Sequence, residues 1–411
     1  MRCILHDFAG HPFQAQLSRQ LAARGHKVLH VYPDGLPGPK GRLQKHATDP
    51  DGLQFAPIPL SPGFRKYSAR RRFLAQRKYA RDLKCFLSRQ NPDVVLSGNT
   101  PIDVQTELLG YCRRNHIGFV HWVQDVYCQA LQFFFQRRLG AFSKVVAAPF
   151  RLLEKRVAAK SQRTIVIASQ FKKLLTAWGV PESKVTVIEN WAPLDEVPQL
   201  PRENSWRQAK QLGPQPVLLY SGTLGMKHRP DLLYRLAEKL GQDCRVVVLT
   251  DGVGREFLEK QFPLDNLVIL GFQPYDQVPH VLASADILIA TLEADAGQFA
   301  VPSKILTYLC AGRPILLAGP KENLAASILQ QSGGGVVVDP DDPEACVDAA
   351  RELLANPQHR AQLGQKGRNY AERTFDIDRI AADFESVLTA ALQPYSTDSQ
   401  SVPVLPLRSE N

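Results

Sequence analysis

Short apolar runs alternate with longer amphipathic segments along most of this chain. In the first half, the apolar runs that predict buried strands are RCILHDF, HKVLHVY, DVVLSG, FVHWVQD, RTIVIAS and VTVIEN. The segments that predict helices there are QAQLSRQLAARG, Phe73–Arg89 and IDVQTELLGYCRRN. Strands that alternate with helices are typical of parallel sheets covered by helices on both faces. The pattern therefore predicts an α/β fold of the doubly wound type.

The alternation lapses once, near the middle of the chain. The stretch from Trp191 to Pro216 contains five prolines and predicts a linker. Beyond it the alternation restarts, with strands at PVLLYSG, CRVVVLTDG, LVILGF, DILIATL and VVVDP, and helices at RPDLLYRLAEKLG and Val278–Ser284. We therefore predict two Rossmann-like domains, at residues 1–195 and 196–376. A further helix at 377–392 precedes a polar, proline-bearing tail at 393–411 that predicts disorder.

The segment VPSKILTYLCAGRPILLAG, residues 301–319, predicts a buried helix followed directly by a strand. Gly312 accepts the left-handed geometry that ends a helix, and Pro314 cannot continue one. At the other end, Ser303 is expected to cap the first amides, and Lys304 places a cation beside them. A helix start with exposed amides and a lysine suits phosphate binding. The segment therefore indicates an α/β protein that handles nucleotides.

The composition is that of an ordinary globular protein, with 44% apolar and 22% charged residues. No apolar run approaches the roughly 20 residues that a membrane-spanning helix needs. Met1–Leu5 already has a strand pattern, so we expect no signal peptide. The seven cysteines are scattered and form no C-x-x-C pair. This spacing favours reduced thiols and predicts a cytoplasmic protein.

The charge is distributed unevenly. Residues 1–200 carry 30 Lys and Arg against 14 Asp and Glu, whereas the remainder carries 20 against 26. Cations gather in residues 64–89 and Arg137–Arg163, which suggests a polyanionic partner or an anionic membrane. Residues 64–89 either form an amphipathic helix with its cations in water, or dock on anionic lipid at the inner face of the plasma membrane. Nucleic-acid binding is not expected, because no recognition module is evident.

Several segments occur in a defined order in the second half: YSGTLGMKHRPDLL, TDGVG, LGFQPYDQVPHVLASADILIATL, VPSKILTYLCAGRP and SGGGVVVDPDDPEA. Together they resemble the donor half of glycosyltransferase family 4, the retaining GT-B enzymes, and within it the colanic-acid and O-antigen type. In the first half, HPFQAQLSRQLAARGHKVLHVYP and VIENWAPLDE resemble the family's opening strand–loop–helix and its hinge. The resemblance implies an acceptor domain at 1–195 and a nucleotide-sugar donor domain at 196–376, facing each other across a cleft. It also implies that the helix at 377–392 crosses back to the first domain.

The loop Ser221–Gly225 is the first candidate donor site. A nucleotide sugar carries a diphosphate leaving group, so catalysis largely consists of stabilising charge on that group. The loop, with Gly222 and Thr223, follows a strand and can bring backbone amides close to phosphate. Thr223 occupies the position where the family has an arginine. We expect Lys227 to be the diphosphate cation, with His228 second; the alternative is that Lys227 and Arg229 are solvated residues of a first helical turn.

The resemblance places a second donor cluster at Val301, Ser303 and Lys304, in a loop that meets the β-phosphate and the sugar. Taken alone, the P-S-K motif more often marks an ordinary helix cap with a surface lysine. Its position after DILIATLEADAGQFAV favours the donor site.

Two glutamates of the family motif are absent from this chain. Their positions fall at Phe299 and Thr307, so Thr307 offers at most a hydroxyl to the ribose. Glu293 and Asp295 lie nearby in the sequence. They either take the place of the missing glutamates or are exposed polar residues of the loop. The departure puts the identity of the donor in question.

Two further turns are candidates for the donor site. Asp251 and Gly252 end a strand, which makes them either an edge of the donor cleft or a plain turn, with equal weight. Phe272 follows the next strand, and it either walls the nucleotide base, as the resemblance implies, or belongs to the core.

The first half contributes two candidate positions. Gly10 lies in the first strand-to-helix loop, which faces the cleft in GT-B folds. In HWVQDVY, strand alternation puts His121, Val123 and Asp125 on one face. Family members often contact the reacting sugar from this strand, and Asp125 is the stronger candidate. For His121, a packed and hydrogen-bonded role is the favoured alternative, and Gln124 stands where a histidine is common.

We expect no metal and no other cofactor. The D-x-D pattern at Asp339–Asp342 resembles a metal site, but Asp342-Pro343-Glu344 is better explained as a helix cap with proline at the first helical position. The resemblance implies the same, because GT-B enzymes seldom need a metal.

The predicted function is transfer of a hexosyl residue from a nucleotide-diphosphate sugar to a hydroxyl of a glycan or a polyprenyl-diphosphate-linked acceptor. The resemblance implies retention of configuration and a role in surface polysaccharide assembly. Two alternatives remain, a sugar-nucleotide epimerase of the same fold and a non-catalytic GT-B scaffold. The scaffold is considered because both family glutamates are missing.

Overall fold

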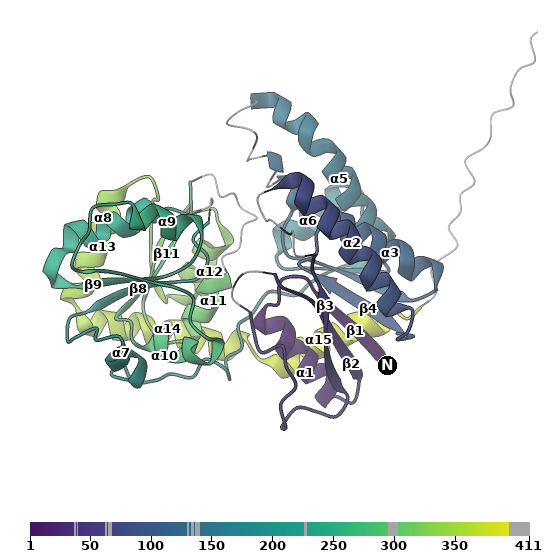
Figure 1. Cartoon of the computed structure of the whole chain (residues 1–411), viewed down its shortest axis with the longest axis horizontal. Coiled ribbons are helices and arrows are strands. Elements are labelled where there is room, and N and C mark those ends of the chain that lie inside the picture. The colour runs from purple at the N-terminus through teal and green to yellow at the C-terminus, as the bar shows by residue number, and fades with distance from the viewer. Residues whose placement is uncertain are drawn as a thin grey trace, which may run out of the picture.

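The computed structural model describes residues 1–393, apart from 37, 39, 62–63, 65–67, 130, 133–134, 136–139, 226–227 and 295–302. The chain forms two lobes, each built on its own parallel sheet (Figure 1). This agrees with the predicted α/β, doubly wound architecture. The predicted disorder of the tail concerns residues that, beyond 393, lie outside the described ones.

The N-terminal lobe holds a seven-stranded sheet in the order β3-β2-β1-β4-β5-β6-β7. Its strands are β1 (Arg2–Asp7), β2 (Lys27–Asp34), β3 (Leu53–Pro59), β4 (Val94–Gly98), β5 (Gly118–Val123), β6 (Arg163–Val166) and β7 (Val185–Val187). Its helices are α1 (Pro12–Ala23), α2 (Ala69–Leu87), α3 (Ile102–Arg114), α5 (Ser143–Lys160) and α6 (Ser169–Ala177). Helices α2, α3 and α5 contribute to the core on one face of the sheet, and α1 contributes to the core on the other.

The C-terminal lobe holds a six-stranded parallel sheet in the order β10-β9-β8-β11-β12-β13. Its strands are β8 (Val217–Ser221), β9 (Arg245–Leu249), β10 (Leu267–Leu270), β11 (Ile287–Thr291), β12 (Ile315–Ala318) and β13 (Gly335–Val338). Its helices are α7 (Ser205–Ala209), α8 (Pro230–Leu240), α9 (Val253–Glu259), α10 (Val278–Ala283), α11 (Ser303–Cys310), α12 (Leu324–Ser332), α13 (Pro343–Ala355) and α14 (Pro357–Thr374).

The last helix, α15 (Ile377–Ala390), follows α14 and packs on α1, β5 and β6 of the N-terminal lobe (Figure 1). The ring of Phe384 lies 4.7 Å from that of Trp122 and 5.9 Å from that of Trp191. Glu385 accepts hydrogen bonds from Arg24 and His26, both at 2.7 Å. Helix α15 is therefore built into the core of the first domain.

Among the described elements, the hydrophobic pattern did not predict β3, α5, α6, α7, α9 and α12. Strand β3 contains Pro57 and Pro59, which weaken a strand pattern, and proline is tolerated there because β3 is an edge strand. Helix α7 lies inside the predicted linker. Asn204 caps it by accepting the amide of Arg207, and Trp206 and Arg207 are buried. The proline-rich stretch is thus partly packed structure.

The predicted helix ends are correct at two positions. Gly312 has φ = 66° just after α11, and Asp342 caps α13 by accepting the amide of Ala345 at 2.9 Å. The capping role expected of Ser303 is wrong, because Ser303 is the first residue of α11 and already lies inside the helix. Over the described ranges, no helix is both long and apolar enough to cross a membrane.

Candidate active site

Candidate residues gather at the carboxyl ends of the strands in both lobes. Ligands of open α/β sheets bind at this edge, where the strand order reverses. In the C-terminal lobe the reversal lies between β8 and β11, next to the loop Ser221–Gly225 and the start of α11. In the N-terminal lobe it lies between β1 and β4, next to Gly10 and residues 99–103.

The loop after β8 holds itself in place through its own amides. Gly222 has φ = 125°, a conformation that favours glycine. The amides of Gly222, Leu224 and Gly225 donate to the Leu249 carbonyl (3.0 Å), Thr250 Oγ1 (3.1 Å) and His228 Nδ1 (3.1 Å). These three amides are therefore engaged within the protein, and Thr223 is the exposed residue of the loop.

Lys304 supplies a cation at this edge. Its Nζ lies 3.5 Å from the centroid of the Tyr220 ring and 3.6 Å from the position that a Cβ on Gly222 would occupy. Nζ is buried and finds no hydrogen-bond partner among the residues that the structure describes. Burial lowers the pKa of the amine well below its ordinary value. A phosphate oxygen beside Gly222 would supply the missing partner.

Tyr308 fixes the helix that carries Lys304. Its hydroxyl accepts the amide of Ser221 at 2.9 Å and donates to the Ser221 carbonyl at 3.2 Å. Helix α11 is thereby tied to the end of β8. The sequence reasoning missed both Tyr220 and Tyr308, whose signal was only that of buried aromatic residues.

Asp251, Gly252 and Phe272 lie together at the same edge of the sheet. Asp251 Oδ2 accepts the amide of Phe272 at 3.0 Å, and Oδ1 pairs with Arg255 at 3.4 Å. Gly252 has φ = 81° at the start of α9, and Phe272 is half-buried. The turn after β9 and the turn after β10 are therefore linked by the hydrogen bond between Asp251 and Phe272.

The remaining donor candidates are spread around Lys304. Lys227 and Val301 lie outside the described residues. Ser303 is exposed, and Thr307 is half-buried on α11, three residues beyond Lys304. The described donor candidates around Lys304 therefore lie on α11 and in the loop after β8.

His228 and Arg229 have structural contacts of their own. The His228 ring accepts the Gly225 amide, so it shapes the loop after β8. Arg229 pairs with Asp231 at 2.8 Å and Asp341 at 3.1 Å, and the side chain is largely buried. Arg229 is thus not the solvated first-turn residue that the alternative assumed, because it joins α8 to the loop after β13.

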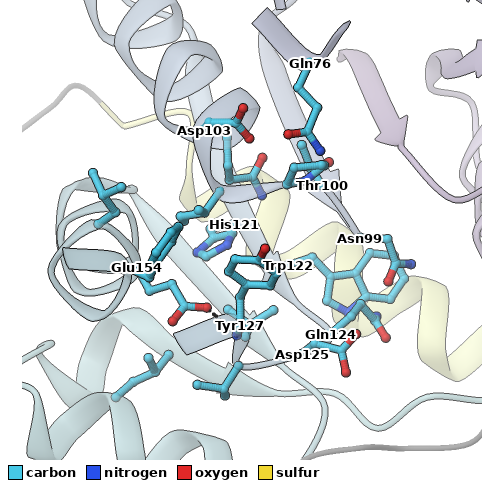
Figure 2. Close-up of a pocket in the computed structure, with 18 of the residues that line it drawn as sticks. Gln76, Asn99, Thr100, Asp103, His121, Trp122, Gln124, Asp125, Tyr127 and Glu154 are labelled. Atoms are coloured by element: carbon cyan, nitrogen blue, oxygen red, sulfur yellow. Dashed lines mark hydrogen bonds between the residues drawn. The ribbon is translucent and has the colours of Figure 1, made fainter. Parts of the chain in front are cut away.

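The N-terminal lobe contains a cavity of about 520 Å³ at the carboxyl ends of β4 and β5 (Figure 2). Its walls come from these strand ends and from helices α2, α3, α5 and α6. The apolar part of the lining is formed by Phe73, Pro101, Ile102, Val123, Val126, Phe150, Leu153, Leu175 and Trp178. The charged residues of the lining are Arg72, Asp103, Asp125 and Glu154.

Both residues singled out on β5 line this cavity (Figure 2). The His121 side chain is 8% exposed, and its Nδ1 has no hydrogen-bond partner within the described part of the chain. Burial lowers the pKa of His121 to about 4, so the ring is neutral at pH 7. Asp125 lies just beyond the strand and is exposed. His121 is therefore not the fully hydrogen-bonded histidine that the favoured alternative expected.

Two further residues position the segment that carries Asp125, and the sequence reasoning missed both. Glu154 on α5 accepts the amides of Tyr127 at 2.6 Å and Cys128 at 3.0 Å. Arg72 on α2 donates to the Tyr127 hydroxyl at 2.6 Å. Glu154 is buried on a helix whose other charged residues are all cations, and this solitary buried carboxylate was the available signal.

Gly10 serves the backbone of the first loop. It has φ = 77°, and a Cβ there would lie 3.2 Å from side-chain atoms of both Leu43 and Lys40. The buried Asp7 carboxylate accepts the amides of Ala9, Gly10 and His11, although burial raises its pKa to about 7. The Gly10 amide is therefore already engaged.

A smaller cavity of about 200 Å³ lies between the lobes. It is lined by Ile167 and Ile188 from the first lobe, and by Leu306 and Leu324 from the second.

Two Rossmann-like lobes, each with its candidate residues at the carboxyl edge, define the GT-B class of proteins.

Comparison with known proteins identifies the family. A model described as Glycosyltransferase Family 4 matches residues 14–196, and one described as Glycosyl transferases group 1 matches residues 202–370. The chain belongs to the family-4 GT-B glycosyltransferases.

Two curated relatives are distant. The probable glycosyltransferase WbjE of Pseudomonas aeruginosa is 26% identical over 318 residues, covering 72% of this chain and 75% of WbjE. The sulfoquinovosyl transferase SQD2 of Arabidopsis thaliana is 26% identical over 162 residues, covering 39% of this chain and 30% of SQD2. The chain thus spans less than a third of the length of SQD2.

Two solved structures share the fold. Sucrose-phosphate synthase from Thermosynechococcus elongatus superposes with a TM-score of 0.71 at 16% identity, over 94% of this chain and 98% of that one. The Anabaena protein HepE in complex with UDP-glucose superposes with a TM-score of 0.67 at 13% identity, over 95% of this chain and all of the HepE chain. At these identities the match shows the fold alone.

Proposed function

We propose that this protein transfers a hexosyl residue from a nucleotide-diphosphate sugar to a hydroxyl of a glycan or lipid-linked acceptor, with retention of configuration. The observation that carries the proposal is the buried amine of Lys304, which contacts the Tyr220 ring, has no hydrogen-bond partner among the described residues and lies beside Gly222. An unpaired amine in such a place is costly unless an anion completes it. The diphosphate of a sugar donor is such an anion.

In this mechanism the Lys304 amine and the dipole of α11 stabilise negative charge on the departing diphosphate. The bond between the anomeric carbon and the β-phosphate oxygen breaks, and a bond from the acceptor oxygen forms on the same face. The acceptor proton passes to the departing phosphate oxygen. Asp125 and His121 contact the acceptor in the opposite lobe, and Lys227 is proposed as a second cation on the diphosphate. No metal enters these steps.

The similar proteins guide the choice of substrates. HepE has been solved with UDP-glucose, so UDP-glucose is the first donor to test. WbjE and SQD2 are named as glycosyltransferases, which supports glycosyl transfer here. A role in surface polysaccharide or O-antigen assembly at the cytoplasmic face of the plasma membrane is part of the proposal.

The membrane contact is assigned to α2 and α5. Phe73, Leu74, Val145 and Leu152 are all about half exposed or more, which is unusual for large apolar side chains. Exposed cations flank them on both helices: Arg70, Arg71, Arg77, Lys78, Arg81, Lys144, Arg151, Lys155, Arg156 and Lys160. Apolar residues surrounded by cations fit the interface of an anionic bilayer. The surface extends the predicted 64–89 region by adding α5.

The test is thermal stabilisation of the whole chain by UDP-, GDP-, dTDP- and ADP-sugars, followed by product analysis. We expect one class to stabilise the protein and Lys304→Ala to abolish that shift; Lys227→Ala is expected to lose most of it. Stabilisation by no nucleotide sugar would favour the scaffold alternative. Release of free nucleotide without any acceptor would favour the epimerase.

A further inference from the structure

The cavity of the N-terminal lobe contains polar atoms that the fold itself does not satisfy. Asp103 Oδ2 and His121 Nδ1 both line it, both are buried, and neither has a hydrogen-bond partner among the described residues. Figure 2 draws both side chains among the residues that line the cavity, with His121 below Asp103 in this view. Unsatisfied buried polar atoms at a cavity wall indicate a ligand that supplies hydrogen bonds.

The charges of the lining decide what kind of ligand fits. Three carboxylates, Asp103, Asp125 and Glu154, face the cavity, against the single guanidinium of Arg72. That guanidinium donates one hydrogen bond to the Tyr127 hydroxyl at 2.6 Å, and its charge offsets only one of the three carboxylates. A phosphate or carboxylate placed here would meet like charges in a partly desolvated site, which is unfavourable. The wall thus has a net negative charge that disfavours anions, and its lining residues also include two buried donors without a partner in the described part of the chain, Asn99 Nδ2 and Trp122 Nε1.

The apolar part of the lining supports the same ligand. Phe150 packs edge-on against Tyr127 at 5.7 Å, and Trp178 and Phe73 also line the cavity. Aromatic walls combined with a few polar groups are typical of small-molecule sites, and the volume of about 520 Å³ has room for a sugar ring. Sugar hydroxyls both donate and accept, so they pair with Asp103 Oδ2, with His121 Nδ1 in either tautomer and with Asn99 Nδ2, while the C–H faces of the sugar pack on the rings.

We infer that this cavity is the acceptor subsite and that it binds an uncharged sugar ring through Asp103 and His121. The inference rests on the proposed function and names the chemical class of its acceptor. In a lipid-linked acceptor, the terminal sugar enters the cavity and the diphosphate stays outside it, near the cations of α2 and α5. A sugar phosphate or uronic acid is excluded as the acceptor residue.

The experiment measures binding of methyl glycosides of glucose, galactose, mannose and N-acetylglucosamine to the full chain by saturation-transfer NMR, with and without UDP. Glucose 6-phosphate and glucuronate serve as anionic probes of similar size. We expect at least one neutral glycoside to bind and both anions to give no signal. Asp103→Asn keeps an acceptor for the first amides of α3 but removes the carboxylate, and it should raise the Kd about tenfold. Asp82→Asn, on the exposed side of α2, is the matched control and should leave binding unchanged.

The outcomes separate the two claims. Equal or tighter binding of the anionic sugars, or unchanged neutral binding in Asp103→Asn, overturns the inference. A protein that binds a nucleotide sugar but no neutral glycoside keeps the proposed function and loses this subsite. Failure of donor binding in the thermal-shift panel overturns the proposed function instead. Circular dichroism of Asp103→Asn shows whether it folds, and Asp103→Glu, which keeps the charge, provides a second variant that should retain discrimination against anions.

Discussion

The carboxyl edges of the two lobes have the same architecture and opposite electrostatics. In the C-terminal lobe, a buried amine lies beside a glycine loop and over the Tyr220 ring, and it lacks a hydrogen-bond partner among the described residues. In the N-terminal lobe, three carboxylates and a neutral histidine line a cavity with one guanidinium. The first edge favours an anion, and the second favours an uncharged ligand that forms hydrogen bonds. Equivalent positions of one fold thus differ in the charge of the ligand that they favour, as the proposed transfer reaction requires.

The largest expected effect comes from removing the cation of the donor edge. Lys304→Met keeps the apolar stem and removes the amine, and it should lower kcat/KM by about 100-fold, the usual loss for one electrostatic stabiliser of a leaving group. The unliganded variant should melt at a higher temperature than the wild type, because a buried amine without a partner destabilises the fold. Transfer assays and melting curves measure both. Lys321→Met, at an exposed lysine of the same lobe, should change neither.

The same amine predicts proton uptake on donor binding. Burial lowers the pKa of Lys304 well below its ordinary value, and a bound diphosphate raises it again. Calorimetric titration in buffers of different ionisation enthalpy should therefore give different observed heats for the wild type. A buffer-independent heat would show that the amine is already charged in the free protein.

A smaller loss is expected when the Asp125 segment is released from α5. Glu154→Ala removes the acceptor for the Tyr127 and Cys128 amides and should lower kcat by roughly 10- to 100-fold, because small misplacements of reacting groups have effects of that size. Glu154→Gln keeps one acceptor oxygen and should recover part of the rate. The KM for the donor should stay constant, since the donor binds in the other lobe. Glu107→Gln, at an exposed carboxylate of α3, is the control. A rise in the donor KM of Glu154→Ala as large as its fall in kcat would indicate a general structural defect.

The hydrophobic pattern predicted both sheets because most of their strands are buried on both faces and form uninterrupted apolar runs. Strand β3 was missed because an edge strand tolerates Pro57 and Pro59, and α7 because its short segment lies among prolines. The family resemblance assigned Gly222 and Lys304 to two donor clusters, and the structure places the Lys304 side chain beside Gly222. It did not predict that loop amides would be engaged with Leu249 and Thr250.

The acceptor cavity shows what the pattern could not predict. Asp103 and Glu154 lie on different helices, far apart in sequence, and no local motif marks them as neighbours of His121. Their convergence depends on how α3 and α5 pack over the sheet, which a periodic pattern does not specify. Residues of this kind were therefore accessible only through the tertiary structure.

The exposed face of α2 and α5 gives a more moderate effect, one that is independent of the chemistry. Leu74→Glu combined with Leu152→Glu should weaken cosedimentation with vesicles of phosphatidylcholine and phosphatidylglycerol, with about 1 kcal/mol lost for each negative charge introduced near the surface. Transfer to a soluble acceptor should be unchanged. Phe262→Glu alters a similarly exposed apolar residue of the C-terminal lobe and should not affect vesicle binding. Equal binding of the double variant and the wild type would remove the membrane role of this face.

The smallest expected effect concerns the acid stability of the acceptor lobe. Burial lowers the pKa of His121 to about 4, whereas an unfolded histidine titrates near 6.5, so between these values the unfolded chain binds more protons. Stability therefore falls as the pH drops from about 6.5 towards 4. Burial also lowers the pKa values of His6 and His30, which are buried, and of His11, which is half-buried, and all three contribute in the same direction. His121→Asn should thus remove only a part of the acid-induced loss of stability. Its Tm should decrease less between pH 7 and pH 5 than that of the wild type. His116→Asn, at an exposed histidine, should reproduce the wild-type curve, and a His121→Asn curve parallel to that of the wild type would show that the His121 ring takes up a proton without unfolding.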